Sequence, residues 1–308
     1  MKIGFIGLGT MGRHMASNLM KAGTELVVHD LQREAAVPHC QAGANWADTP
    51  KEVAEASEVV FTSLPGPPEV EDVSLGEKGL LAGLAAGKVY FDLTTNSPAL
   101  VRRIHQIFAA RGIHMLDAPV SGGPRGAETR KLALWVGGDE GVFTRYKGLL
   151  DAIGDQAYYV GPIGTGSIAK LVHNCTTKIV QTALAEVFTM GVKAGVDPLA
   201  LWKAVRQGST GRRRTFDGLA TAFLPGKFDP AGFTLRLAHK DISLATSLGR
   251  EYNVPMRLAN LTLEEMTEAL NRGWGERDSP VTMLLQEERA GVEIRVPEAS
   301  IRQVLDLD

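Results

Sequence analysis

The sequence is poor in the residues that build disulfide frameworks, metal centres and aromatic platforms. It has two cysteines, Cys40 and Cys175, in 308 residues, too few for a disulfide framework or a four-thiolate zinc site. Its seven histidines show no metal-ligand spacing, so we expect no metal ion. Aromatic residues are only 6% of the chain, whereas glycine occurs 34 times. This composition favours an enzyme with tight turns over a protein that stacks bases on aromatic side chains.

A surplus of one charge and a long apolar run are also absent. Lys plus Arg is 33 and Asp plus Glu is 35, giving a net charge of −2. This balance argues against nucleic-acid binding and against a polybasic membrane anchor. No segment approaches the roughly 18 consecutive apolar residues of a membrane-spanning helix. The first twelve residues lack the apolar core of a secretory signal, so we expect a cytoplasmic protein with no membrane or nucleic-acid partner.

The first half of the chain alternates short apolar runs with helical patterns, and this alternation predicts a Rossmann-type, doubly wound α/β domain over residues 1–161. Near-continuous apolar runs are typical of strands buried on both faces of a parallel sheet. The expected strands are 2–6, 25–29, 58–63, 88–93, 114–117, 132–136 and 157–160. The expected helices are 11–22, 33–41, 50–56, 97–111 and 139–151.

The pattern changes near residue 161. Apolar residues recur at steps of three and four from Ile168 to Met190, which predicts one long helix in segment 162–194. A helix of about 29 residues would be roughly 43 Å long. A helix of this length is suited to joining two domains or to forming an interface, so we expect a homodimer or homotetramer. Residues 195–308 show only helical patterns, at 197–207, 234–251, 256–271 and 280–290. We therefore predict an all-α domain for substrate binding and oligomerisation.

A glycine-rich turn follows the first expected strand and opens the first expected helix. It reads Gly7-Leu8-Gly9-Thr10-Met11-Gly12. In this strand–turn–helix setting, the first glycine permits the tight turn, the second lets a pyrophosphate approach the backbone, and the third lets helix and strand pack closely. The helix N-terminus then offers unpaired amides to the phosphates. These residues predict a dinucleotide site.

Asp30 ends the second expected strand, 18 residues after Gly12. A carboxylate there is placed to hydrogen-bond the ribose 2′-hydroxyl and to repel a 2′-phosphate, which favours NAD over NADP. Arg33, three residues further on, would soften this preference. Asp30 is also a candidate N-cap for the helix that follows.

Two further segments follow strands at the edge where a doubly wound sheet binds ligands. They are 63–68, which contains Leu64 and Pro65, and 92–98, which contains Thr95. Ligand contact and ordinary turn chemistry both fit these residues, with Asn96 or Ser97 capping the next helix in the second case.

Taken together, five ordered segments resemble the β-hydroxyacid dehydrogenase family over nearly the whole chain. They are GFIGLGTMG at 4–12, DAPVSGGPRGA at 117–127, GPIGTGSIAKLVHN at 161–174, FTLRLAHKDISLA at 233–245, and Asp278-Ser279. The resemblance implies a 6-phosphogluconate dehydrogenase-like C-terminal domain and reversible hydride transfer between a small 3-hydroxy acid, similar to 3-hydroxyisobutyrate, and its semialdehyde. The chain departs from the family pattern at Arg130-Lys131, His173 and Pro280.

The resemblance also implies roles for individual residues. Lys170 matches the family's catalytic lysine, a general acid and base, and Asn174 its neighbour that helps to hold the substrate. Ser121, Gly122 and Gly123 match the segment that holds the substrate carboxylate. Lys240 matches a lysine near the nicotinamide and Asp241 its partner. Thr95 matches a residue at the boundary of cofactor and substrate, and Leu64, Pro65 and Phe233 match cofactor contacts.

Three points stay open from the sequence. The run Arg212-Arg213-Arg214 fits a solvated basic turn, and it also fits a site where Arg212 reaches a distal substrate carboxylate. His173 and His239 are interpreted as supporting residues. An imine reductase and a non-catalytic dinucleotide-binding module are the alternative functions, whereas decarboxylating 6-phosphogluconate dehydrogenases have longer chains.

Overall fold

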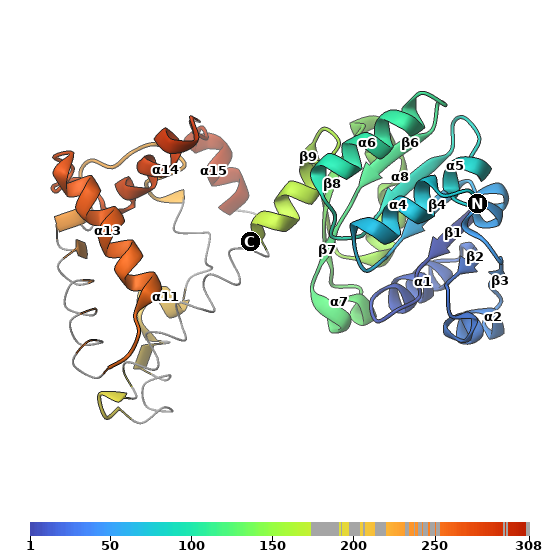
Figure 1. Cartoon of the computed structure of the whole chain (residues 1–308), viewed down its shortest axis with the longest axis horizontal. Coiled ribbons are helices and arrows are strands. Elements are labelled where there is room, and N and C mark those ends of the chain that lie inside the picture. The colour runs from blue at the N-terminus through green and yellow to red at the C-terminus, as the bar shows by residue number, and fades with distance from the viewer. Residues whose placement is uncertain are drawn as a thin grey trace. The chain divides into compact units, whose positions relative to one another are not determined.

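The structure, a computed structural model, forms two compact units, Met1–Thr176 and Thr177–Asp308 (Figure 1). It describes residues 1–173, 191, 193–196, 204–205, 207–212, 220–231, 234–236, 238–239, 242, 246, 250, 253–291, 293 and 295–305. The domain boundary near residue 161 and the single helix over 162–194 stay predictions, since residues 174–190 lie outside this set.

The first unit contains a nine-stranded sheet in the order β3-β2-β1-β4-β5-β6-β8-β7, with β9 paired to β8. The strands are β1 Lys2–Ile6, β2 Glu25–His29, β3 Asn45–Trp46, β4 Val59–Thr62, β5 Val89–Asp92, β6 His114–Asp117, β7 Val120–Ser121, β8 Ala133–Gly137 and β9 Gln156–Gly161. From β3 to β6 all neighbouring strands are parallel, in the order of a dinucleotide-binding fold. The predicted doubly wound α/β fold is confirmed.

Aromatic rings align across one face of this parallel sheet. Phe5, Phe61 and Phe91 are register partners on β1, β4 and β5, and their ring centroids are 6.3 Å and 5.1 Å apart. All three are fully buried, and residues on either side of them in these strands, such as Val60 and Tyr90, pack into the core on the opposite face. Burial on both faces explains why these strands are apolar without interruption.

Strand β8 runs antiparallel to β6 and β7, which the apolar pattern did not predict, whereas β9 at the edge is parallel to β8. Asp117 pairs with Gly137 and Ser121 with Ala133, so β6 and β7 pair with β8 in one register. Between the two strands, Pro119 has no N–H to donate, but its carbonyl accepts a hydrogen bond from the Trp135 N–H at 3.2 Å. This arrangement brings β8 beside the C-terminal end of β6.

Helices cover both faces of the sheet (Figure 1). Helix α1 contacts α7 and α8, whereas α5 contacts α3 and α4, and α4 also contacts α6. The helical elements are α1 Gly12–Lys21, η1 Arg33–Ala36, α2 Val37–Gln41, α3 Pro50–Ala56, α4 Pro67–Leu75, α5 Leu80–Gly83, α6 Pro98–Ala109, α7 Gly123–Thr129 and α8 Glu140–Ile153, and residues 165–173 are helical. Segment 63–68 is therefore only partly a turn, since α4 begins at Pro67.

The described part of the second unit is helical. Its elements are α11 Ser209–Arg212, α13 Arg257–Asn271, η3 Ser279–Thr282, α14 Met283–Ala290 and α15 Glu298–Leu305. Its core includes Phe223, Phe228, Leu235 and Leu285. Among the described residues of this unit, the β-pairing consists of an isolated bridge between Thr234 and Asp278. No helix in the described part of the chain is long and apolar enough to cross a membrane.

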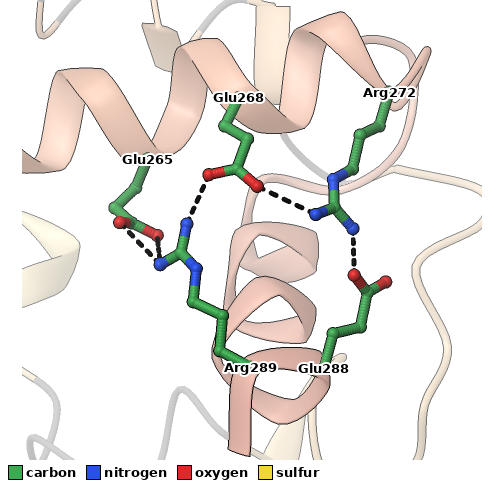
Figure 2. Close-up of polar contacts among 5 residues, drawn as sticks. All are labelled: Glu265, Glu268, Arg272, Glu288 and Arg289. Carbon is green, nitrogen blue, oxygen red and sulfur yellow. Dashed lines mark hydrogen bonds and ion pairs between the residues drawn. The ribbon is translucent and has the colours of Figure 1, made fainter.

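Ion pairs join α13 to α14 (Figure 2). Arg289 on α14 donates to both carboxylate oxygens of Glu265 at 2.7 Å and also to Glu268. Glu268 accepts a further hydrogen bond from Arg272 at 2.8 Å, and Arg272 also donates to Glu288 on α14. Each arginine therefore bridges two carboxylates, and the four pairs form one network.

Candidate active site

Three glycines lie in the turn between β1 and α1, and a Cβ would meet different surroundings at each of them. Gly7 has φ of 92°, and a Cβ on it would lie 2.3 Å from the Ser63 carbonyl oxygen. A Cβ on Gly12 would lie 1.8 Å from the Gly7 carbonyl oxygen. A Cβ on Gly9 would meet nothing within 4 Å. Gly7 and Gly12 therefore keep the turn tight, and Gly9 leaves its outer surface open.

A cavity of about 490 Å³ lies against this turn, and all of its lining residues belong to the first unit. Its size is typical of a cofactor or small-molecule pocket. Of the predicted cofactor residues, Gly7, Gly9, Thr10, Met11, Gly12, Asp30, Leu64 and Pro65 line it. The side chain of Leu8 is buried in the core instead. The open surface at Gly9, beside the first turn of α1, fits a dinucleotide pyrophosphate.

Asp30 is tied to the glycine turn. Its Oδ2 accepts a hydrogen bond from the Leu8 N–H at 2.7 Å, and its Oδ1 accepts one from the Gln32 N–H at 2.8 Å. Gln32 occupies the N-cap position of η1, so Asp30 does not cap this helix. The Arg33 guanidinium lies 5.4 Å from the centre of the Trp46 ring and does not line the cavity.

A buried polar network supports the loops beside the cavity, and sequence reasoning missed it. Asp92, fully buried at the end of β5, accepts hydrogen bonds from Thr62 Oγ1, the Thr94 N–H and Asn96 Nδ2 at 2.9–3.0 Å. Thr94 Oγ1 in turn accepts the Leu64 N–H at 3.0 Å. Burial raises the pKa of Asp92, and these hydrogen bonds oppose that rise. The network links the Leu64 loop to the loop after β5.

Thr95 is exposed between two buried neighbours, Thr94 and Asn96. Ser97 is the N-cap residue of α6, as one alternative predicted, but its side chain makes no capping hydrogen bond. Instead, Asn96 Oδ1 accepts the Ser97 N–H at 2.7 Å. The buried neighbours thus hold this loop while the Thr95 side chain stays accessible.

The predicted carboxylate-binding segment lies where β7 ends and α7 begins. Ser121, half-buried, is the last residue of β7, and Gly123 is the first of α7. Gly122 has φ of 137°, and a Cβ on it would lie 2.9 Å from the Lys131 carbonyl oxygen. Gly123 has φ of 64°, and a Cβ there would meet nothing within 4 Å. The segment combines a hydroxyl with an open backbone, as a carboxylate cradle requires.

Lys170 lies in helix 165–173, whose first turn is fixed by a buried carboxylate. Asp117, at the end of β6, is 1% exposed, and its two oxygens accept the Gly164 N–H at 2.7 Å and the Ser167 N–H at 2.6 Å. This is an N-cap supplied by another element, and it could not be predicted because residues 117 and 164 are distant in the chain. It sets the direction in which the helix leaves the sheet.

The side chain of Lys170 is 9% exposed, and this burial lowers its pKa. Its Nζ lies 5.9 Å from the centre of the Trp135 ring, and the same ring is 5.1 Å from that of His173. Among the described residues, no hydrogen bond or ion pair to Lys170 Nζ is found. Lys170 is thus a buried amine beside an aromatic face, and Trp135 is a neighbour that the sequence pattern presented only as a strand residue.

The remaining predicted residues belong to the second unit or to the part of the long segment after residue 173. Asn174, Phe233, Lys240, Asp241, Arg213 and Arg214 lie outside the described residues. Arg212 is the last residue of α11. His239 Nε2 lies 2.9 Å from Thr267 Oγ1, and its supporting role stays a prediction. Among the described residues, no group of three or more His, Cys, Asp or Glu is arranged to hold a metal ion.

Two family models match consecutive parts of the chain. Residues 2–161 match the NAD binding domain of 6-phosphogluconate dehydrogenase. Residues 164–285 match the NAD-binding domain of NADP-dependent 3-hydroxyisobutyrate dehydrogenase. The break between the two matches falls where the strand–helix pattern of the sequence ends.

Curated relatives are similar over most of the chain. The chain is 35% identical to 2-(hydroxymethyl)glutarate dehydrogenase of Eubacterium barkeri over 95% of this chain and 97% of that protein. It is 37% identical to 3-hydroxyisobutyrate dehydrogenase of Pseudomonas aeruginosa over 79% and 83%. Among solved structures, the Mycobacterium tuberculosis 3-hydroxyisobutyrate dehydrogenase with L-serine aligns with a TM-score of 0.65 at 27% identity, over 92% and 98%.

An imine reductase from Pseudomonas sp. aligns with a TM-score of 0.77 at 17% identity, over 92% of this chain and 98% of that one. At this identity it shows a shared fold and nothing more. The fold, the glycine turn and the relatives together define an oxidoreductase that uses a nicotinamide dinucleotide and acts on a CH–OH group. The chain belongs to the β-hydroxyacid dehydrogenase family.

Proposed function

We propose that the protein catalyses reversible hydride transfer between a small 3-hydroxy acid and its semialdehyde, with Lys170 as general acid and base. The observation that carries the proposal is the buried Lys170, whose pKa is lowered by that burial. A lysine exchanges protons efficiently near neutral pH only when its pKa falls towards about 7–8. The bound nicotinamide would accept the hydride from the carbinol carbon or return it.

The chain's own residues would divide the remaining work. The Ser121 hydroxyl, the tight turn at Gly122 and the open backbone at Gly123 would hold the substrate carboxylate. Lys170 would take the hydroxyl proton during oxidation and return it during reduction. On the resemblance alone, Asn174 would help to hold the substrate and Thr95 would lie between cofactor and substrate. On the same basis, Lys240, Asp241 and Phe233 would complete the nicotinamide end.

We infer a preference for NAD over NADP from two contacts. Both oxygens of Asp30 accept backbone N–H groups at the cavity wall, which holds the carboxylate where a ribose 2′-hydroxyl would donate to it and a 2′-phosphate would be repelled. Arg33, the nearby cation that would favour a phosphate, lies over Trp46.

The names of the relatives narrow the substrate class. Two of them, described above, are named for 3-hydroxyisobutyrate and 2-(hydroxymethyl)glutarate, and a third, 33% identical, is the NAD-dependent L-serine dehydrogenase of Pseudomonas aeruginosa. Each of these acids carries a hydroxymethyl group on the carbon that bears the carboxylate. The three differ only in the third substituent, which is a methyl, an amino or a carboxyethyl group. We propose that the substrate here shares this hydroxymethyl–carboxylate unit. A distal carboxylate is the group that Arg212 would bind.

The test is an activity panel of these three acids and a cyclic imine, each with NAD(H) and NADP(H), on the wild type and on Lys170→Ala. We expect at least one acid to be oxidised, with a higher kcat/KM for NAD than for NADP. Lys170→Ala should lose about 100-fold or more in kcat and keep its affinity for NADH, the scale of a positioned acid–base group.

Lys170→Arg, which keeps the positive charge but cannot release a proton at neutral pH, is the matched control and should be equally impaired. Full turnover by Lys170→Ala would remove Lys170 from the mechanism. Turnover of the imine but of none of the acids would favour an imine reductase. Tight NADH binding without turnover of any of these compounds would favour a dinucleotide-binding module.

A further inference from the structure

Helix 165–173 touches β8 backbone to backbone at Trp135. A Cβ on Gly166 would lie 2.3 Å from the Trp135 carbonyl oxygen, closer than real Cβ atoms approach. A Cβ on Gly137 would lie 2.9 Å from the Gly166 nitrogen. The two glycines therefore let the helix start directly on the strand, with no side chain between them.

Hydrogen bonds to Asp117 fix the position of helix 165–173 on β8. The buried Asp117 carboxylate binds the Gly164 and Ser167 N–H groups, one on each side of Gly166. Lys170 is four residues beyond Gly166, so it lies one turn further along the same helical face. Contact between Gly166 and the Trp135 backbone thus places the Lys170 amine beside the Trp135 indole, at 5.9 Å from the ring centre.

The indole is itself held in place. Trp135 is half-buried on β8, where its backbone N–H donates to the Pro119 carbonyl oxygen at 3.2 Å and fixes the strand. Its ring packs against that of His173, with the centroids 5.1 Å apart. A tryptophan face at this distance attracts an ammonium ion but not a neutral amine. Burial acts in the opposite direction, because it disfavours the ammonium form. Burial and the Trp135 face therefore favour opposite protonation states of Lys170 Nζ.

Other charged or titratable groups lie on the elements around the junction. Asp117 faces it from β6, His173 lies on the helix itself, and Arg102 on α6 reaches the Ile163 carbonyl oxygen near the start of the helix. His105 is also on α6, and burial lowers its pKa. The lowered pKa of Lys170 follows from burial, not from any of these charges.

We propose that Trp135 is a positioning residue for the reaction: its indole face holds the Lys170 ammonium in place and sets the pH at which that ammonium releases its proton. The inference rests on the proposed role of Lys170. It adds a specific division of labour, in which burial favours the neutral amine of Lys170 and the Trp135 face favours its ammonium form.

The test compares Trp135→Leu, which keeps the site apolar but removes the π face, with Trp135→Phe, which retains a π face. The measurement is the pH dependence of kcat/KM for oxidation of the best acid found in the panel. The acid limb of this profile is its low-pH side, where the Lys170 ammonium loses its proton. In Trp135→Leu we expect it to move to lower pH by roughly half a unit, a threefold change in the ratio of ammonium to amine. Trp135→Phe should keep most of the wild-type position.

Trp274→Leu is the matched control, because Trp274 in the second unit lies under the Arg272 guanidinium at 5.4 Å from its ring centre. It removes a cation–π pair of the same kind and should leave the pH profile unchanged. An equal shift in Trp135→Phe and Trp135→Leu would overturn the proposal, since it would mean that the shape of the indole matters and its π face does not.

A second readout does not depend on turnover. Acetylation of Lys170 by trace acetic anhydride, followed by mass spectrometry across a pH series with NADH bound, titrates the amine directly. Trp135→Leu should shift this titration in the same direction as the acid limb. If Lys170→Ala stays active, the proposed function fails. If Lys170→Ala is inactive but Trp135→Leu moves neither the limb nor the labelling curve, only the role of Trp135 fails.

Discussion

Gly9 and Gly12 stand three residues apart in one turn, yet the surroundings of their missing side chains are opposite. A Cβ at position 12 would run into the Gly7 carbonyl oxygen, whereas a Cβ at position 9 would enter open space beside the cavity. The fold itself therefore requires glycine at position 12. At position 9, only a ligand in the cavity would require it.

This difference predicts that Gly9→Ala and Gly12→Ala separate binding from stability. Gly9→Ala should unfold at the wild-type temperature but bind NADH at least about tenfold more weakly, because hydrogen bonds to a charged group are worth about 1.5–3 kcal/mol. Gly12→Ala should lower the unfolding temperature by several degrees, since overpacking costs about 1–3 kcal/mol. Thermal unfolding and fluorescence titration with NADH check both, and a destabilised Gly9→Ala would contradict the steric assignment.

The site residues that could be predicted from the sequence are those recognised by their spacing from nearby residues in the chain. The spacing of Gly7, Gly9 and Gly12 after an apolar run is visible without a structure, and so is an acidic residue at the end of the next strand. Asp117 and Trp135 were not visible, because their roles depend on partners more than 30 residues away in the chain. Their own neighbourhoods look like ordinary strand ends.

At the scale of helices and strands, most differences from expectation arise where proline or glycine opens an element. Turn chemistry was one of two alternatives for the segment containing Pro67 and Pro68, and no helix was expected there. Proline fits the first turn of a helix, where its missing N–H is not needed, and α4 starts there. Helix α7 likewise starts at Gly123 with Pro124 next. The two-residue strands β3 and β7 are too short to give any periodic pattern.

Helices α13 and α14 were predicted from their periodicity, and the ion-pair network between them gives a testable electrostatic contribution. Burial tends to raise the pKa of Glu268, but the hydrogen bonds from Arg272 and Arg289 outweigh it, so the pKa lies below its ordinary value. A carboxyl group whose pKa is lowered by folding stabilises the folded state at pH values above its ordinary pKa. This stabilisation is lost as the pH falls through the pKa of the folded state. Glu268→Gln should therefore increase hydrogen exchange in α13 and α14 at pH 7.

The effect of Glu268→Gln should shrink in about 1 M salt, where the screening length falls to roughly 3 Å. It should also disappear at a pH below the lowered pKa, where wild-type Glu268 is itself protonated. Glu264→Gln on the same helix removes a carboxylate for which no ion pair is found among the described residues, and it is the matched control. Equal exchange in the two variants would mean that the network does not hold the helices together.

At the scale of the whole chain, the switch from alternating strands and helices to helical patterns alone correctly predicted the fold class. Each unit has its own apolar core. The two family models also meet near residue 162. What the pattern did not predict is that the cavity of the glycine turn is built entirely from residues between Ile6 and Val73, one part of one unit.

That location predicts how NADH changes the stability of the chain. A ligand stabilises the unit that binds it by RT ln(1 + [L]/Kd), about 2.7 kcal/mol at one hundred times Kd. Saturating NADH should therefore slow hydrogen exchange in β1, β2, β4 and α1 of the first unit far more than in α13 and α14 of the second. Gly9→Ala, measured at the same NADH concentration, should lose this protection while its exchange without NADH stays that of the wild type. Equal protection of α13 would mean that cofactor binding also orders the second unit, and that the two units do not respond independently.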